Sequence, residues 1–196
     1  MVAMTIQDWW AGPDRPLTVD DLEELCDLMP DDDRRLELDD GMLIVSPAPV
    51  PIHGFVLTRL TQILVAACPD HLVVLQGPGV TISRYQYRIP DLTIGPVACL
   101  ESKSLEEPPQ LVVEVASKRT RLYDRNRKKD VYEGFGIPAY WIVEPDRDHP
   151  RLIVFELRDG KYEQVAEVSG DEQFRAERPF AVTIRPSALV RTGPLN

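Results

Sequence analysis

A short apolar run that contains one acid, residues 110–118 (QLVVEVASK), constrains the fold more than any other stretch of the chain. Leucine, valine and alanine fill almost every position from 111 to 116, as in strands that are buried on both faces of a sheet. Glu114 interrupts this run. A carboxylate among buried aliphatic side chains is unfavourable unless a metal, a cation or a proton neutralises it. The run therefore predicts a central strand that carries either a site or an ion pair.

Hydrophobic periodicity and turn signals predict the elements around this strand. We expect helices over residues 18–29, 53–67 and 124–135, hairpins around Asp40-Gly41 and Asp159-Gly160, and strands over residues 72–75, 80–87, 139–143 and 180–184, with one more after Pro90. This order predicts a mixed central β-sheet flanked by helices, an α/β fold that borders on α+β. We expect one domain over residues 1–196, with an acidic N-terminal extension that contains a helix (1–33) and a core (34–190).

The charge of the chain is strongly uneven along the sequence. The net charge of −10 by itself argues against a nucleic-acid-binding protein, and residues 14–40 hold twelve acids and three bases. Residues 118–129 (KRTRLYDRNRKK) instead carry seven lysines and arginines and one acid, directly after the strand with Glu114. Such a run forms either a solvated helix face or a phosphate-binding surface, and both readings stay open.

The sequence also indicates a cellular setting. Three scattered cysteines favour a reduced, cytoplasmic environment. No apolar run is long enough to span a membrane, and the first residues do not resemble a secretory signal. We therefore expect a cytoplasmic protein without a membrane partner.

Three charged residues are candidates for chemistry. Asp91 follows Pro90 at the start of an apolar strand, Glu114 lies in the central strand, and Lys128 lies in the helix that follows it. Carboxylates on adjacent strands can share Mg²⁺, which binds one or two carboxylates together with water and phosphate oxygens. Lys128 shares a helical face with Val131 and Tyr132, so we expect that face to turn toward the sheet.

Each of these residues also has a purely structural interpretation. Glu114 would then form a buried ion pair with Lys128 or an arginine. Asp91 would cap a turn at a strand end, and Lys128 would cover apolar surface with its aliphatic stem. Their occurrence together in one region favours a site, because buried carboxylates in strands are uncommon.

The order of several motifs resembles a known family. The chain runs from IPD through LVVEVAS and a D-x3-K-x3-Y segment to GIPAYWIVEP, and LELDDGMLIVSPAP followed by His53 lies upstream. Over roughly residues 34–156, this order is similar to the Uma-type family of putative restriction endonucleases, within the PD-(D/E)XK nuclease superfamily. The resemblance implies a restriction-endonuclease-like mixed sheet, with the site at one end of the sheet.

The resemblance also implies roles for individual residues. Asp91 and Glu114 would be the metal-binding acids. The superfamily usually has a lysine two positions after the glutamate, where this chain has Ala116, so the lysine role would pass to Lys128, with Lys118 as the lesser candidate. Glu37 and His53 also match the family pattern and would be additional site residues. Glu37 could equally be a surface residue of the hairpin, and a histidine at a helix start is more often a cap or a satisfied polar residue than a base. Ser117 and Tyr132 would hydrogen-bond around the site.

These features together predict a Mg²⁺-dependent endonuclease that hydrolyses DNA phosphodiester bonds, with Mn²⁺ as a substitute cation. The basic cluster would contact phosphates through Arg119, Arg121, Arg125, Arg127 and Lys129. A homodimer would serve cleavage of two strands. The alternative is a nuclease-like scaffold with weak or no catalysis that binds nucleic acid or protein. RNA or a nucleotide as substrate stays open, because the sequence offers no base-stacking aromatic platform that would distinguish RNA.

Overall fold

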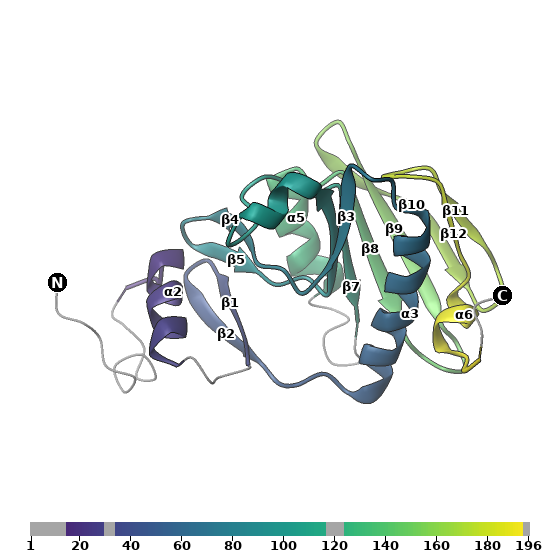
Figure 1. Ribbon diagram of the computed structural model, residues 1–196, viewed down its shortest axis with the longest axis horizontal. Coiled ribbons are helices and arrows are strands. Elements are labelled where there is room, and N and C mark those ends of the chain that lie inside the picture. Colours follow the sequence, from purple (N-terminus) through teal and green to yellow (C-terminus); the bar gives the residue numbers. More distant parts are fainter. Residues whose placement is uncertain (1–14, 30–33, 117–123, 194–196) are drawn as a thin grey trace. The chain divides into compact units, whose positions relative to one another are not determined.

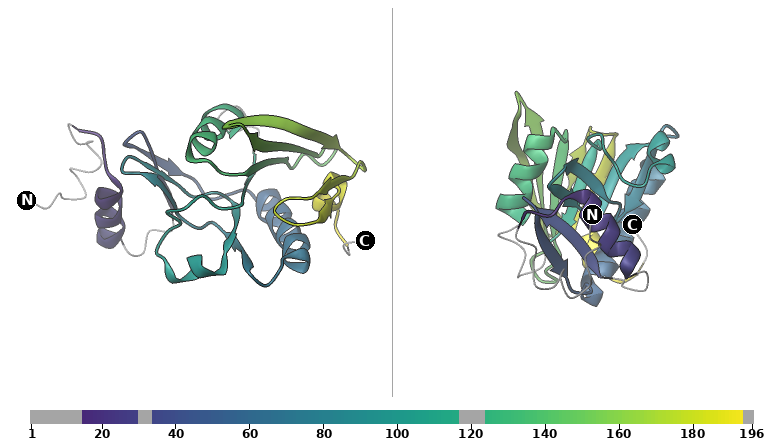
Figure 2. Two further views of the ribbon diagram at one scale, coloured as in Figure 1. Left: turned by 90° about the horizontal axis from the view of Figure 1, so that it is seen from above. Right: turned by 90° about the vertical axis from the view of Figure 1, so that its left-hand side faces the viewer.

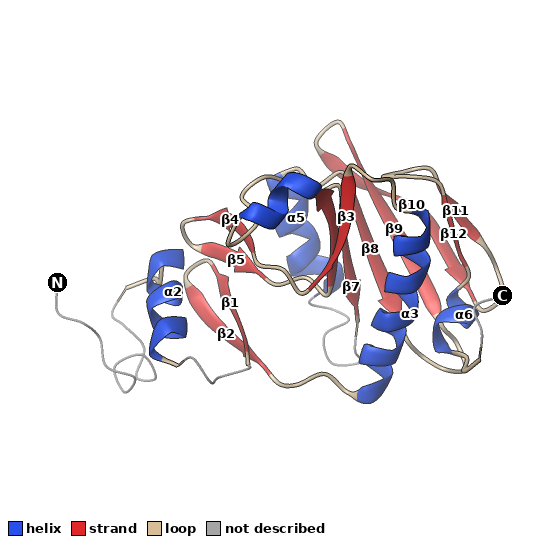
Figure 3. Ribbon diagram, viewed as in Figure 1, coloured by secondary structure: helices blue, strands red, loops and turns tan. Residues whose placement is uncertain are grey.

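The computed structural model describes residues 15–29, 34–116 and 124–193, which form two compact units. The first unit contains the described residues up to Ala48 together with Gly79–Ile89, and the second contains Pro49–Pro78 and the described residues from Pro90 onward. Figure 1 follows the chain through its elements, and Figure 3 separates helices from strands by colour. Within the described ranges, no helix is long and apolar enough to cross a membrane. The single domain expected from the sequence stays a prediction.

The first unit is a four-stranded antiparallel sheet, ordered β2-β1-β5-β4, with one helix. The apolar face of this helix packs on the sheet, and its exposed face carries acids. The elements are α2 (Val19–Leu28), β1 (Arg35–Asp39), β2 (Met42–Ser46), β4 (Val80–Ser83) and β5 (Gln86–Arg88).

The hairpin predicted around Asp40-Gly41 is confirmed, and the start of the first helix carries a capping box. Asp40 and Gly41 turn the β1–β2 hairpin with positive φ angles of 49° and 78°, as two-residue hairpin turns require. Thr18 caps α2: its hydroxyl accepts from the Asp21 amide, and the Asp21 carboxylate accepts from the Thr18 amide.

The strand expected over residues 80–87 is instead a hairpin of β4 and β5. The turn lacks a glycine or proline signal, and the Ser83 hydroxyl stabilises it by accepting from the Tyr85 amide. Long-range contacts also hold the turn, because the carbonyl oxygens of Arg84 and Tyr85 accept from the amides of Val19 and Gly41. Contacts of this kind cannot be read from local sequence.

The second unit is built on a six-stranded mixed sheet, ordered β10-β9-β8-β7-β6-β3. All of its neighbouring strands are antiparallel except β7 and β8. The strands of this sheet are β3 (Leu72–Gln76), β6 (Leu92–Pro96), β7 (Leu111–Val115), β8 (Ala139–Glu144), β9 (Arg151–Arg158) and β10 (Lys161–Ser169). A separate pair of strands and the helical segments are β11 (Phe174–Ala176), β12 (Val182–Ile184), α3 (Pro51–Ala67), η1 (Val97–Glu101), η2 (Asp124–Lys128), α5 (Lys129–Phe135) and α6 (Pro186–Val190).

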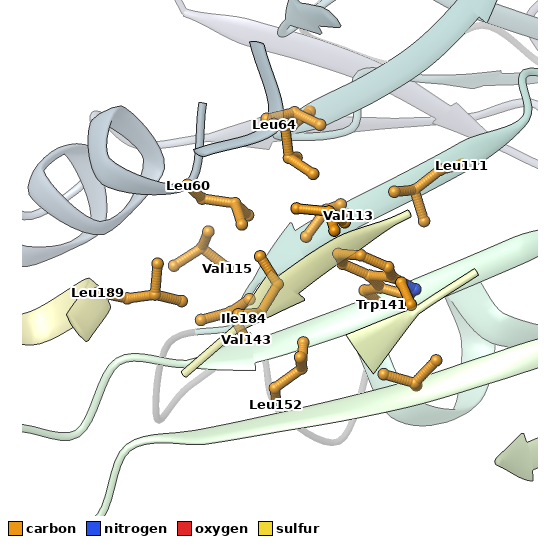
Figure 4. Packing of buried hydrophobic residues seen from close by; sticks show 14 of the residues in the cluster. Leu60, Leu64, Leu111, Val113, Val115, Trp141, Val143, Leu152, Ile184 and Leu189 are labelled. Carbon is orange, nitrogen blue, oxygen red and sulfur yellow. The ribbon is translucent and has the colours of Figure 1, made fainter. Parts of the chain in front are cut away.

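Helices cover both faces of this sheet. Leu60 and Leu64 of α3 pack with Val113 and Trp141 on one face, and Leu189 of α6 joins the same cluster (Figure 4). Tyr132 of α5 lies on the opposite face, where its ring contacts Tyr140 of β8 edge-on, with 5.2 Å between the centroids. Figure 2 shows α3 and α5 on the two sides of the sheet. The predicted mixed sheet flanked by helices is confirmed.

Some features of this unit go beyond the sequence prediction. The strands β11 and β12 pair beside α6, and only β12 is expected, because segments of three to five residues carry too little periodicity. The helix expected over residues 124–135 begins as the π-helical turn η2 before it continues as α5. Its predicted end is confirmed at Gly136, which has a φ of 86° in the left-handed region.

Candidate metal-binding and catalytic site

The register of β6 and β7 brings the two candidate acids together. The pairing of β6 with β7 ends at Leu92 and Val113, and Asp91 directly precedes the first of these residues while Glu114 directly follows the second. The Asp91 carboxylate accepts from the amide of Val115, the residue next to Glu114, at 2.7 Å. Both side chains are buried, with 4% and 3% of their area exposed. The sheet therefore holds two neighbouring carboxylates at one end of its central strands.

Glu114 is neutralised by the helix that covers its face of the sheet. Lys128 Nζ lies 2.8 Å from Glu114 Oε1, and the Tyr132 hydroxyl donates to the same oxygen at 2.7 Å. Lys128 is itself buried. These partners account for a carboxylate in an otherwise apolar strand. The prediction that Lys128 and Tyr132 share a face turned toward the sheet is confirmed.

Local structure fixes this helix against the sheet. Lys128 is the last residue of η2 and Tyr132 lies in α5, four positions later, so both side chains reach the same carboxylate. On β10, Lys161 Nζ and the Tyr162 amide donate to the carboxylate of Glu133, at 2.7 Å and 2.6 Å. The next residue after Tyr132 thus anchors the helix that carries the candidate lysine.

This anchor makes stability depend on pH. The hydrogen bond from Lys161, followed by that from the Tyr162 amide, holds the pKa of Glu133 below its usual range. A carboxylate with a lowered folded-state pKa stabilises the fold above its unfolded pKa of about 4.3, and this stabilisation is lost as pH falls through the folded-state pKa. We expect Glu133→Gln to lower the free energy of unfolding by about 1 kcal/mol at pH 7.

Denaturant unfolding of the wild type and Glu133→Gln at several pH values measures this effect. The difference in unfolding free energy should stay constant from pH 6 to 8 and shrink below about pH 4. A difference that persists unchanged into strong acid would contradict the role given to the ionised carboxylate.

Asp91 is held by two donors from different elements. Its Oδ2 accepts from the Val115 amide of β7 at 2.7 Å and lies 3.0 Å from His53 Nε2 of α3. The backbone pairing of β6 and β7 ends at Leu92 and Val113, and the Val115 contact continues it through the Asp91 side chain. His53 is 38 positions away in sequence, and no spacing rule predicts the contact. His53, which the sequence offers as an additional site residue, therefore contacts Asp91 in the structure.

The remaining predicted residues lie in varied surroundings. Glu37 is buried in the first unit, where its Oε1 accepts from the Ile89 amide at 2.7 Å, so its role as a third carboxylate stays a prediction. Lys129 Nζ lies 5.0 Å from the centroid of the Phe155 ring, a cation–π distance, and Arg127 is half-buried. Four predicted residues lie outside the described residues, and the side chain of a fifth is not described: Ser117, Lys118, Arg119, Arg121 and Arg125.

The donor set suits a hard divalent cation. Asp91 and Glu114 offer carboxylate oxygens from adjacent strands, and Mg²⁺ needs only one or two carboxylates when water and phosphate supply the other ligands. In the part of the chain that the structure describes, no three His, Cys, Asp or Glu side chains form a metal-binding group. A cation here would therefore depend on these two acids and on ligands from water and substrate.

Comparison with known proteins agrees with this architecture. The family model "Uma2: Putative restriction endonuclease" matches residues 19–188. The chain belongs to this family. The Uma2 match spans both acids and Lys128, and it confirms the resemblance that the motifs indicate. No curated protein matches the chain.

A solved structure has the same fold as this chain. It is described as a crystal structure of a putative nuclease belonging to DUF820 from Anabaena variabilis ATCC 29413, and it aligns with a TM-score of 0.70. The alignment covers 89% of this chain and 98% of the other at 15% sequence identity. At that identity the likeness establishes the fold and leaves activity to be argued from the site.

Proposed function

We propose that the protein is a Mg²⁺-dependent endonuclease that hydrolyses phosphodiester bonds of DNA. One observation carries this proposal: the buried acids Asp91 and Glu114 adjoin the last paired residues of β6 and β7, and Lys128 forms an ion pair with Glu114. Membership in a family whose description is "Putative restriction endonuclease" supports the same reaction class. Both acids would hold the cation, and Mn²⁺ would replace Mg²⁺.

The chain's own residues have defined tasks in this proposal. Lys128 orients the attacking water and offsets the negative charge that builds on the phosphate. Tyr132 holds the Glu114 carboxylate in place through its hydroxyl. The cation, when bound, polarises the phosphodiester and lowers the pKa of a bound water.

Basic residues before and within the helix would position DNA. Arg127 and Lys129 flank Lys128, and we propose that they contact phosphates without reading sequence. The same task is proposed for Arg119, Arg121 and Arg125. Cleavage of both strands of a duplex needs two such sites, so we propose that the protein acts as a homodimer.

A cleavage assay tests the proposed activity. Purified protein is incubated at low salt with single-stranded DNA, double-stranded DNA or RNA, in Mg²⁺, Mn²⁺ or EDTA. We expect cleavage of DNA in either cation and none in EDTA. If no DNA substrate is cut in either cation, the proposed activity is wrong, and cleavage of RNA alone would reassign the substrate.

The ion pair itself favours one alternative, a nuclease-like scaffold that binds without cutting. In that case Lys128 and Tyr132 would satisfy Glu114 permanently, and no cation would enter. Metal binding separates the two functions, because a ligand that binds the folded state raises the melting temperature by mass action. We expect Mn²⁺ to raise the melting temperature of the wild type but not of an Asp91→Asn/Glu114→Gln double variant. No rise for the wild type would favour the scaffold.

A further inference from the structure

His53 lies at the start of α3, close to the candidate site. It is the third residue of the helix, and its side chain is mostly buried, with 14% of its area exposed. Its Nε2 atom lies 3.0 Å from Oδ2 of Asp91. The helix α3 packs on the sheet face opposite to the one that α5 covers. A helix on each face therefore holds one of the two acids.

The other ring nitrogen of His53 indicates which tautomer is present. Nδ1 is buried and has no hydrogen-bond partner among the residues that the structure describes. A hydrogen on Nδ1 would be a buried donor without an acceptor, which is unfavourable, whereas a bare lone pair there costs less. The hydrogen therefore belongs on Nε2, where it is donated to Asp91.

This donor acts together with the main chain of β7. The Val115 amide donates to the same Oδ2 atom at 2.7 Å, so two donors from a strand and a helix hold one oxygen of the carboxylate. Two such contacts fix the rotation of the carboxylate group and thereby the direction of Oδ1. Neither ring nitrogen of His53 is placed to accept a proton from water, since Nε2 faces Asp91 and Nδ1 is buried.

We infer that His53 is a positioning residue, which orients the Asp91 carboxylate for a divalent cation by donating from Nε2. This inference rests on the proposed function, because it assigns the carboxylate to a cation. Groups that hydrogen-bond to metal ligands typically change metal affinity by ten- to a hundredfold when they are removed. His53 does not cap α3, whose start has no side-chain cap hydrogen bond, and its Nε2 is instead a polar atom bonded to Asp91.

Matched substitutions test the donor. The amide nitrogen of glutamine reaches about as far as Nε2, whereas that of asparagine reaches only as far as Nδ1. We expect His53→Ala and His53→Asn to weaken Mn²⁺ binding by about tenfold in calorimetry, and His53→Gln to restore it to within about threefold. In cleavage, kcat at a fixed subsaturating Mn²⁺ concentration should follow the same order while KM for DNA stays unchanged.

Amide hydrogen exchange supplies a readout that needs no metal. If His53 fixes Asp91, the Val115 amide should exchange faster in His53→Ala than in the wild type, and His53→Gln should restore its protection. The melting temperature of each metal-free variant is measured as well, because a variant that is globally less stable would exchange all of its amides faster.

Different outcomes separate this inference from the proposed function. If the wild type binds no Mn²⁺, the proposed metal site is wrong, and the inference fails with it. If the wild type binds Mn²⁺ but His53→Ala binds it equally well, only the positioning role is wrong. If His53→Gln binds Mn²⁺ as weakly as His53→Ala does, a hydrogen-bond donor at this position does not restore the affinity, and the inference is again overturned.

Discussion

Replacement of Glu114 by glutamine is expected to lower the rate constant of DNA cleavage by at least about a thousandfold, equivalent to about 4 kcal/mol of transition-state stabilisation. The amide oxygen of glutamine can still accept from Tyr132 and Lys128, which both bond to Oε1 in the structure. What the variant loses is the negative charge that a cation needs. Single-turnover cleavage at several Mg²⁺ concentrations measures the effect.

Glu133→Gln is the matched control for this prediction. It makes the same chemical change at an ion-paired glutamate on α5, but that side chain bonds to Lys161 and Tyr162 of β10. Glu133→Gln should keep cleavage near the wild-type rate while it lowers stability slightly. If both variants retained most of the activity, Glu114 would have no role as a metal-binding acid.

Most of the fold can be predicted from patterns that depend on near neighbours in sequence. The apolar run around Glu114 becomes β7, the Asp40-Gly41 pair turns a hairpin, and Gly136 ends α5. The pattern fails where distant contacts decide the structure. The turn between β4 and β5 is the clearest case, because the amides of Val19 and Gly41 bond to its carbonyl oxygens.

The same division applies to the candidate site. Helical spacing predicts that Lys128 and Tyr132 share a face, and both side chains do reach Glu114. The donors to Asp91 cannot be predicted in this way, because they come from a helix start far back in the chain and from a main-chain amide of the next strand. Sequence spacing describes a single element, whereas a site at a sheet end is made where several elements meet.

Replacement of Lys128 by methionine is expected to have two opposite effects. DNA cleavage should fall by about a hundredfold or more, because the water and the phosphate lose a positioned cationic donor. Mn²⁺ should bind about tenfold more tightly, because a positive charge 2.8 Å from Glu114 repels an incoming cation and occupies an oxygen that the cation would use. Calorimetry of Mn²⁺ binding and single-turnover cleavage measure the two effects separately.

A fall in cleavage together with a rise in Mn²⁺ affinity would show that Lys128 and a cation both use the Glu114 carboxylate. A purely structural ion pair predicts no rise in affinity. Without Lys128, the buried Glu114 carboxylate loses its counterion, so the metal-free variant should be less stable by about 3 kcal/mol. Mn²⁺ should then raise its melting temperature more than that of the wild type, since the cation replaces the lost charge. Lys161→Met, which removes an exposed lysine paired with Glu133, should change neither cleavage nor Mn²⁺ affinity. If Lys128→Met lost stability with no gain in Mn²⁺ affinity, Lys128 and Glu114 would form an ion pair that holds the fold, and no cation would share it.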